Sequence, residues 1–210
     1  MKPFDRHIPV INPAETLNFR AAFEALLATP SAGEHEVAQG DIVQLAWLDT
    51  PVGLLLAGAT DAAVCFLEFT ERERLESQLA RLRREVSATL AVAENALLRQ
   101  MRQELAEYFA GTRREFTLPL SYRGTPFQER VWSALREIPY GKTISYQQLA
   151  TQLGCRDAVR AVGGANGLNR IAIIVPCHRV VNSNGALGGY GGGLWRKQHL
   201  LHLERGDALL

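Results

Sequence analysis

Short apolar runs separated by turn residues dominate the stretch from position 42 to position 69. The runs Ile42 to Leu48, Gly53 to Ala59 and Ala63 to Phe69 have strand length, and the first and third carry β-branched and aromatic residues. Asp49-Thr50-Pro51 and Thr60-Asp61, which lie between them, favour turns. The pattern therefore predicts an antiparallel meander of three strands.

Helical spacing of apolar residues is found on both sides of this meander. Glu15 to Thr29 places apolar side chains on roughly one face of a helix. A second helix is predicted from Thr70, a capping residue, to about Val86, and a third from Ala96 to Ala110, where a glycine stops it. Phe116 to Tyr122 is predicted to be one more extended stretch.

A new unit opens after Ser121-Tyr122-Arg123-Gly124, where the composition shifts. Thr125-Pro126 places a capping residue before a proline at the first helical position. The helix that follows is predicted to bury Phe127, Val131, Trp132 and Leu135. We therefore predict an N-terminal extension with a helix (1–40), an α/β domain (41–123) and a C-terminal domain (124–210).

Two shorter helices follow in the C-terminal part. Ser145 to Leu153 and Asp157 to Gly167 flank a tight turn, which is the spacing of a helix-turn-helix unit. On that spacing alone, a DNA-binding unit and an ordinary pair of packed helices fit equally well. The outer positions of the second helix are mostly small, so on DNA it would read few base edges and bind mainly through phosphates. A last helix is predicted from about Leu194 to Arg205.

Composition and charge narrow the class of protein. The 210 residues are 47% hydrophobic, which is enough to bury a core, and no apolar stretch approaches the roughly 20 residues of a membrane span. Because the N-terminus also lacks the features of a signal peptide, we expect a soluble, cytoplasmic protein. Residues 1–124 carry 13 Lys or Arg against 17 Asp or Glu, whereas residues 125–210 carry 10 against 5. A phosphate backbone would therefore dock on the C-terminal half.

The strongest chemical candidate lies between Ile171 and Val181. The apolar residues Ile171 to Val175 predict a buried, strand-like run that a proline ends, which leaves Cys177 at an abrupt turn with His178 beside it. A lone cysteine after an apolar run is most often inert, but the basic neighbours His178 and Arg179 favour the nucleophilic thiolate.

The other cysteines and the histidines do not suggest a metal site. Cys65 and Cys155 lack the spacing of a disulfide framework or of a zinc site, and we expect both to be structural. No cysteines pair with the histidines at ligand spacing, so neither a metal nor another cofactor is expected; these histidines are His7, His35, His199 and His202.

The PCHRV signature of the O6-alkylguanine-DNA alkyltransferases is matched by Pro176 to Val180, and the chain resembles this family over most of residues 121–206. Order and spacing are also similar in TPFQERVWSALREIPYGKTISYQQLA, AVRAVGGANGLN and NGALGGYGGGLWRKQHLLHLE, and ELAEYFAG at 104–111 fits. The chain looks like the C-terminal repair part of the Ada-type proteins. The resemblance implies an α/β (α+β) fold, with a ribonuclease H-like N-terminal domain and a mainly helical, winged helix-turn-helix-like C-terminal domain.

The same resemblance implies roles for four residues. Cys177 would accept the alkyl group, His178 would be its base through a bridging water, and Glu204 would orient His178. Asn169 would hold the hinge between the recognition helix and the active-site strand. Without the resemblance, Glu204 would be assigned to a solvated helix face and Asn169 to an ordinary turn.

For DNA binding, the resemblance implies that Tyr146 contacts the flipped base and the 3′ phosphate. Arg160 would be the arginine finger, which fills the space that the flipped base leaves in the stack. Tyr190 would stand against the guanine, and backbone groups of Val180 and Gly191 would meet its polar edge. Without the resemblance, Tyr146 would be an ordinary packed aromatic and Arg160 a solvent-facing or phosphate-binding arginine. The glycine-rich loop around Tyr190 and Gly191 would be a flexible lid.

Together these residues imply direct-reversal DNA repair. One methyl or larger alkyl group would move irreversibly from O6-alkylguanine, and from O4-alkylthymine, in double-stranded DNA to Cys177. The protein would act as a monomer, once per molecule. Two other classes stay open: a damage-binding protein of the same fold, which replaces the cysteine, and a cysteine hydrolase, which needs an oxyanion hole outside this motif. The cysteines of a phosphotriester-sensing module, present in some relatives, are missing here.

Overall fold

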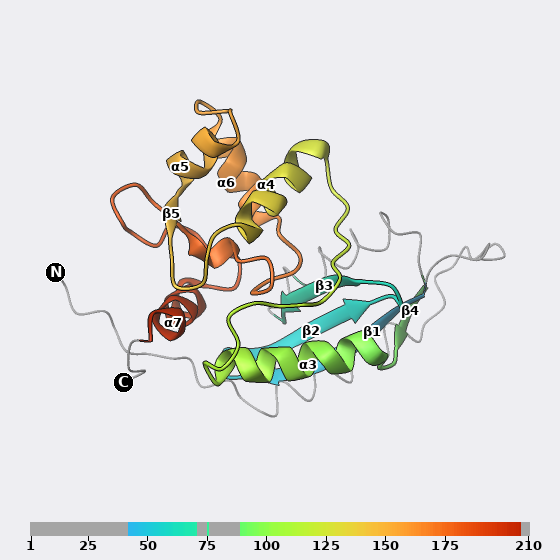
Figure 1. Cartoon of the computed structure of the whole chain (residues 1–210). Helices are drawn as coiled ribbons and strands as arrows, with labels where there is room; N and C mark the ends of the chain where they lie inside the picture. The colour runs from blue at the N-terminus through green and yellow to red at the C-terminus, as the bar shows by residue number, and fades with distance from the viewer. Residues whose placement is uncertain (1–41, 71–74, 76–88, 207–210) are drawn as a thin grey trace. The chain divides into compact units, whose positions relative to one another are not determined.

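The computed structural model describes residues 42–70, 75 and 89–206, which Figure 1 traces in colour. The N-terminal extension, with the helix predicted from Glu15 to Thr29, lies outside the described residues. So does most of the helix predicted from Thr70 to Val86, of which Leu75 is described as a buried helical residue. None of the described helices is long and apolar enough to cross a lipid bilayer.

A four-stranded sheet with the order β3-β2-β1-β4 forms the N-terminal part. The strands β1 (Ile42–Thr50), β2 (Gly53–Ala59) and β3 (Val64–Phe69) pair antiparallel, which confirms the predicted meander. The strand β4 (Thr89–Val92) pairs parallel to β1 and lies outside the predicted strands. It is missed because it is only four residues long, and these residues are exposed or half-buried without a clear alternation of apolar and polar positions.

The helix α3 (Ala96–Phe109) lies along one face of this sheet (Figure 1). Asn95 caps it by accepting a hydrogen bond from the backbone N–H of Leu98 at 2.9 Å. Buried side chains recur along it at intervals of three and four residues, as the predicted helix requires; the large ones are Leu98, Met101, Leu105 and Tyr108.

The segment after α3 is only partly extended. Within the predicted stretch Phe116 to Tyr122, a single parallel bridge joins Leu120 to Val64. The backbone N–H of Val64 donates to the carbonyl of Pro119 at 2.9 Å. Because Pro119 has no N–H of its own, the ladder does not continue. The predicted extended stretch therefore contributes one bridge to the sheet, at Leu120.

The helix α4 (Pro126–Arg136) opens the C-terminal part with a capping box made by Thr125 and Gln128. Phe127 packs against the core from the first turn but stays half-buried, so its predicted burial is wrong. The other three predicted residues are buried: Val131, Trp132 and Leu135.

The next two helices are α5 (Tyr146–Gln152) and α6 (Val159–Gly167). Ser145 caps α5, and Gly154 takes a φ of 70° in the turn between the two helices. The predicted start of α6 at Asp157 is two residues early, because Asp157 makes no cap and Ala158 is the residue before the helix.

Short strands and a final helix complete the described chain. The strands β5 (Ile144–Ser145) and β6 (Val180–Val181) pair in parallel. The helix α7 (Leu194–Arg205) has the predicted limits and ends at Gly206, whose φ of 73° is the left-handed conformation common after a helix.

The apolar run before the cysteine is buried as predicted, but it is a turn and not a strand. Ile171 makes one parallel bridge to Leu67, after which the N–H of Val175 donates back to the carbonyl of Ile171 at 2.9 Å. Ile173 has a φ of 70°, which is unfavourable for a β-branched residue. Apolarity predicts burial, whereas hydrogen bonds to neighbouring segments determine the direction of the backbone.

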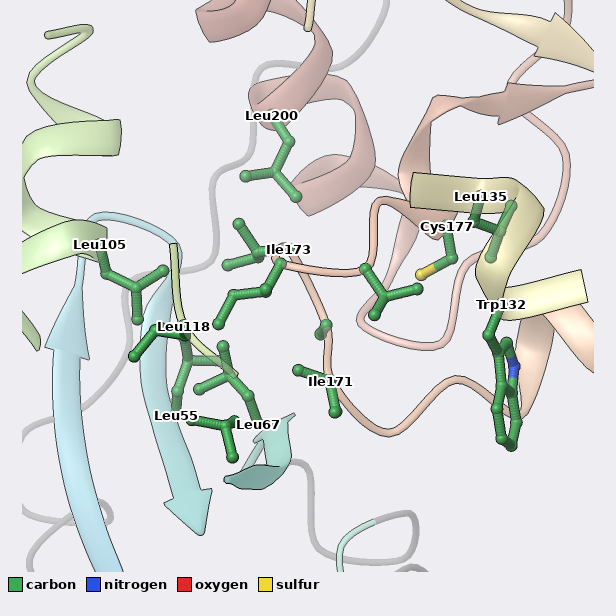
Figure 2. Packing of buried hydrophobic residues seen from close by; sticks show 14 of the residues in the cluster. Leu55, Leu67, Leu105, Leu118, Trp132, Leu135, Ile171, Ile173, Cys177 and Leu200 are labelled. Carbon is green, nitrogen blue, oxygen red and sulfur yellow. The ribbon is translucent and has the colours of Figure 1, made fainter. Parts of the chain in front are cut away.

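One hydrophobic core joins the sheet to the helices. Figure 2 shows Ile171 and Ile173 between the strand residue Leu67 and the helical residues of the C-terminal part. Leu67 also donates to the carbonyl of Arg170 and accepts from the N–H of Ala172, both at 2.8 Å. The turn that precedes the cysteine is therefore fastened to β3.

Replacing Trp132 by Phe tests the contact between α4 and α6. The indole Nε1 of Trp132 donates to the carbonyl of Ala165 at 2.8 Å, and both residues are buried. Trp132→Phe leaves that carbonyl without its donor, so the free energy of unfolding should fall by about 1–3 kcal/mol in urea denaturation. An unchanged midpoint and slope would show that this hydrogen bond adds no net stability.

Candidate active site

Cys177 opens a short 3-10 turn, η1 (Cys177–Arg179), directly after Pro176. Its backbone N–H donates to the carbonyl of Val175 at 2.8 Å, and the residue is 6% exposed. The side chain lines a pocket of about 330 Å³, which is at the small end of the range for ligand sites. The turn thus presents a largely buried thiol to a cavity.

Both the sheet and the helical part supply walls of this pocket. From β3 come Glu68 and Phe69, and the ring of Phe69 meets the ring of Tyr190 edge to face at 6.0 Å. A side chain at Gly192 would overlap with the ring of Phe69, so the glycine lets this loop approach β3. The remaining lining residues come from α5, α6 and the loops beside them: Tyr146, Gly163, Asn166, Gly167, Asn169, Ala172, Gly189 and Gly191.

Asn169 fastens the turn that precedes Cys177. Its Nδ2 donates to the carbonyl of Val175 at 2.8 Å and to the sulfur of Cys177 at 3.1 Å. Its Oδ1 accepts from the N–H of Ile171 at 3.0 Å. Asn169 is buried, so a single amide orders both ends of the turn and provides a donor at the sulfur, which favours a thiolate.

His178 is fully buried, and its Nε2 lies 2.8 Å from Oε1 of Glu204. Burial holds the pKa of His178 below its ordinary value, against the opposing effect of Glu204. The imidazole is therefore neutral at rest, and the nitrogen that faces the ionised carboxylate carries the proton. The other nitrogen, Nδ1, is a buried acceptor without a hydrogen-bond partner among the described residues.

Glu204, in the last turn of α7, receives hydrogen bonds from several segments. Tyr108 Oη donates to Oε1 at 2.7 Å, and the N–H of Gly141 donates to Oε2 at 3.1 Å. The guanidinium of Arg179 spans both oxygens, with Nε 2.9 Å from Oε2 and Nη2 3.0 Å from Oε1. Glu204 is 5% exposed, so the alternative of a solvated helix face is wrong.

The donors around Glu204 decide its ionisation. Burial by itself raises the pKa of this carboxyl, but the hydrogen bonds from His178 and Arg179 and the positive charge of Arg179 outweigh burial and hold the pKa well below its ordinary value. Glu204 therefore stays a carboxylate, and it can orient His178 and stabilise a positive imidazolium without taking the proton itself.

Lys197 is a buried cation near the pocket. Its Nζ donates to the carbonyl of Val180 at 2.6 Å and lies 5.9 Å from the centre of the Tyr146 ring. Burial lowers the pKa of Lys197 to about 8, although the neighbouring Cys177 opposes the shift. Its hydrogen bond to Val180 fixes the backbone of the strand β6, which follows η1.

The structure brings most of the predicted site residues together. Five of them line the pocket, namely Tyr146, Asn169, Cys177, Tyr190 and Gly191. His178 follows Cys177 in η1 and is bonded to Glu204. The other two do not line it. Arg160 is exposed on α6, and Val180 is buried in β6, where Lys197 contacts its carbonyl.

Several site residues are missed by the sequence pattern. Nothing in the periodicity singles out Glu68 or Tyr108, which come from the sheet domain. Arg179 is expected to act on the thiol through its charge, but its guanidinium is engaged by Glu204 and by the carbonyl of Ile138 at 2.6 Å. Lys197 could have been found, because it shares one helical face with Leu200, Leu201 and Glu204.

The other two cysteines, Cys65 and Cys155, are not among the residues that line this pocket. Burial raises the pKa of the Cys65 thiol to about 11, which agrees with an inert, structural cysteine. Within the described residues, no three His, Cys, Asp or Glu side chains gather in a way that could hold a metal ion. His7 and His35 lie outside the described residues.

Comparison with known proteins matches both parts of the chain to one family. Residues 44–122 match its ribonuclease-like domain and residues 126–206 its DNA binding domain. The methylated-DNA--protein-cysteine methyltransferase of Mycolicibacterium paratuberculosis is 43% identical over 164 residues, which are 78% of this chain and 93% of that protein. Its namesake from Mycobacterium bovis is 58% identical over 105 residues, 50% of this chain and 64% of that protein.

A solved structure supports the same assignment. Mycobacterium tuberculosis OGT in complex with DNA superimposes with a TM-score of 0.66 at 41% identity, over 80% of this chain and 94% of that one. The predicted fold class, an α/β N-terminal domain followed by a mainly helical C-terminal domain, is thereby confirmed. The chain belongs to the 6-O-methylguanine DNA methyltransferase family.

Proposed function

We propose that this chain repairs DNA by moving an alkyl group from O6-alkylguanine to its own Cys177, once per molecule. One observation carries the proposal: Cys177 lines the pocket with the amide of Asn169 on its sulfur, and the next residue, His178, is bonded to Glu204. The activity is that of a methylated-DNA–protein-cysteine S-methyltransferase, and the names of the relatives support it. The intact Cys177 speaks against a damage sensor that lacks the nucleophile.

The chemistry follows from the resting protonation states. The proton of Cys177 passes through a bridging water to Nδ1 of His178, and Glu204 stabilises the imidazolium. The sulfur attacks the alkyl carbon, an S–C bond forms, and the C–O6 bond breaks with its electron pair going to the guanine. The guanine then takes up a proton. Because a thioether is stable and the described residues of the site include no group placed to cleave it, the reaction stops after one turnover.

The proposed guanine site uses the remaining pocket residues. Tyr146 and Tyr190 contact the flipped base and Gly191 offers backbone groups to its polar edge. The carbonyl of Val180 already accepts from Lys197, but a carbonyl oxygen has two lone pairs and can accept from guanine as well. Asn169 holds the hinge after α6. The segment that its hydrogen bonds order is a turn and not the strand that the resemblance implied.

The proposed DNA interface is the helix-turn-helix formed by α5 and α6. Side chains added at Gly164 or Gly167 would meet no atom within 4 Å, so this face of α6 is open to a groove. Arg160 is exposed on the same helix, where it can enter the duplex and replace the extruded base. The excess of basic residues in the C-terminal part supplies the charge for phosphate contacts.

The proposal includes several further properties expected from the sequence and from the family resemblance. The protein acts as a monomer in the cytoplasm on double-stranded DNA, needs no cofactor and also accepts O4-alkylthymine. Its DNA-binding and catalytic domain begins at about residue 124, after an α/β domain that begins at about residue 41.

The stoichiometry of transfer tests the proposal directly. Incubation with excess O6-methylguanine duplex should add one methyl group per protein, located by peptide mass at Cys177, with Cys65 and Cys155 unmodified. Cys177→Ala should bind DNA and accept no methyl group, while Cys155→Ala should react like wild type. A ratio of released product to protein well above one would indicate a hydrolase and contradict the proposal.

Glu204→Gln tests the proposed activation of the thiol. The amide keeps the shape but loses the charge that favours the imidazolium, so alkyl transfer should slow by roughly 10²-fold and the pKa of the Cys177 thiol should rise. Rapid-quench kinetics and thiolate absorbance across pH measure these effects. If rate and thiol titration both match wild type, the roles given to His178 and Glu204 are wrong.

The same variant has a stability effect with a definite pH dependence. Glu204→Gln leaves Arg179 as a buried charge without its counter-ion, which costs about 3–5 kcal/mol at neutral pH. Because the folded pKa of Glu204 is depressed, its contribution is present above the ordinary carboxyl pKa and is lost as the pH falls through the folded value. Urea denaturation should therefore show the difference from wild type shrinking in acid.

Arg160→Ala tests base flipping. The loss of the finger should slow transfer strongly on saturating duplex, less on single strands and almost not at all on a free O6-alkylguanine base, which needs no flipping. The neighbouring exposed Arg156 provides a charge-matched control, because Arg156→Ala should only weaken DNA binding. Equal losses on all three substrates would assign Arg160 to pocket chemistry or folding.

A further inference from the structure

We infer that Tyr108, a residue of the sheet domain, lowers the proton affinity of His178 through the carboxylate oxygen that the two residues share. Its hydroxyl donates to Oε1 of Glu204 at 2.7 Å, and the same oxygen faces Nε2 of His178 at 2.8 Å. The inference rests on the proposed function, because it concerns the base of the same reaction. Tyr108 acts on His178, the proposed general base, only through Glu204, so it is a positioning residue.

Holding the carboxylate in place is not the distinctive task of Tyr108. Arg179 already bonds both oxygens of Glu204, and the N–H of Gly141 bonds Oε2. These donors fix the plane of the carboxylate with Tyr108 removed. What the tyrosine adds is electrostatic, because its hydroxyl hydrogen takes up part of the negative charge on the oxygen that supports His178.

The sign of the effect follows from the direction of the hydroxyl dipole. Its positive end lies at Oε1, beside the proton on Nε2, so it disfavours a second positive charge on the imidazole. Tyr108 is fully buried, where such dipoles are weakly screened. Burial and the charge of Glu204 raise the pKa of Tyr108 well above its ordinary value, so the hydroxyl remains a donor at every working pH.

This arrangement benefits the reaction because only neutral His178 can accept the proton of Cys177. A lower proton affinity keeps Nδ1 available further into acid. The N-terminal domain would thus take part in the chemistry through one hydroxyl, although the nucleophile and its base both belong to the C-terminal part.

The other charged or titratable groups near this pair do not change when the hydroxyl is removed. Glu204 is faced by His178 and Arg179 from η1 and by Tyr140 from the segment after α4. His178 is faced by Arg179 and also by Lys197 from α7, whose pKa of about 8 places its titration on the alkaline side. The acid side of the pH profile therefore reports on His178.

The test compares Tyr108→Phe with Tyr140→Phe in the full chain. The ring of Tyr140 lies 6.0 Å from that of Tyr108, but its hydroxyl points to the carbonyl of Leu203 at 3.4 Å and not to Glu204. Tyr108→Phe should raise the pKa of His178 in an NMR titration by on the order of one unit. The acid limb of transfer to a free O6-alkylguanine base should move to higher pH by a similar amount. Tyr140→Phe should move neither.

A second variant makes the test independent of whether Tyr108→Phe folds. A ring-fluorinated tyrosine placed at position 108 keeps the shape and donates more strongly, so it should lower the pKa of His178. An unchanged His178 titration in folded Tyr108→Phe, or a shift of the same sign in both variants, overturns the inference. If wild type transfers no alkyl group, the proposed function fails instead, and the His178 titration can still be read.

Discussion

A carboxylate buried at the end of α7 is the constraint on which the rest of the site depends. An unpaired charge in such a position costs several kcal/mol, so Glu204 requires donors from every side. They come from three separate stretches of chain, namely Tyr108 in α3, Gly141 after α4, and His178 with Arg179 in η1. Each of these elements must be in place before the carboxylate is satisfied. Cys177, the proposed nucleophile, belongs to one of them, so the same requirement positions its backbone.

The charge of Glu204 also fixes what the neighbouring groups can do. Its ionisation places the proton of His178 on Nε2 and leaves Nδ1 as an acceptor, while burial keeps the ring neutral at rest. Asn169 supplies a donor at the sulfur, and it also bonds the turn that contains Ile173. The left-handed conformation of Ile173 costs on the order of 1–2 kcal/mol, which the buried hydrogen bonds of Asn169 help to offset.

Local signals predict much of this molecule from its sequence, and contacts between distant segments account for the rest. The cap at Thr125 and the meander from 42 to 69 are properties of short stretches, and they are found where predicted. The strand β4 and the turn at 171–175 depend on partners far along the chain, so periodicity misses the first and misreads the second. The same holds for the candidate site. Most of the site residues that the family resemblance assigned gather around the pocket. Tyr108 had no such assignment, and the only sequence signal for it is that a tyrosine on the buried face of a helix needs a hydrogen-bond acceptor.

The register of β3 links the two domains, because it determines which residues of the strand contact the helical domain. Leu67 bonds the backbone on both sides of Ile171, and the next two residues, Glu68 and Phe69, reach the pocket wall. A strand shifted by one residue would exchange its two faces, so it would lose the pairing with the turn and the packing of Phe69 on the glycine-rich loop together. The pocket therefore cannot keep its shape on the helical part alone. Strand β3 forms one wall of the pocket, so substitutions in β3 should change the shape of the pocket as directly as substitutions in the glycine-rich loop that packs on Phe69.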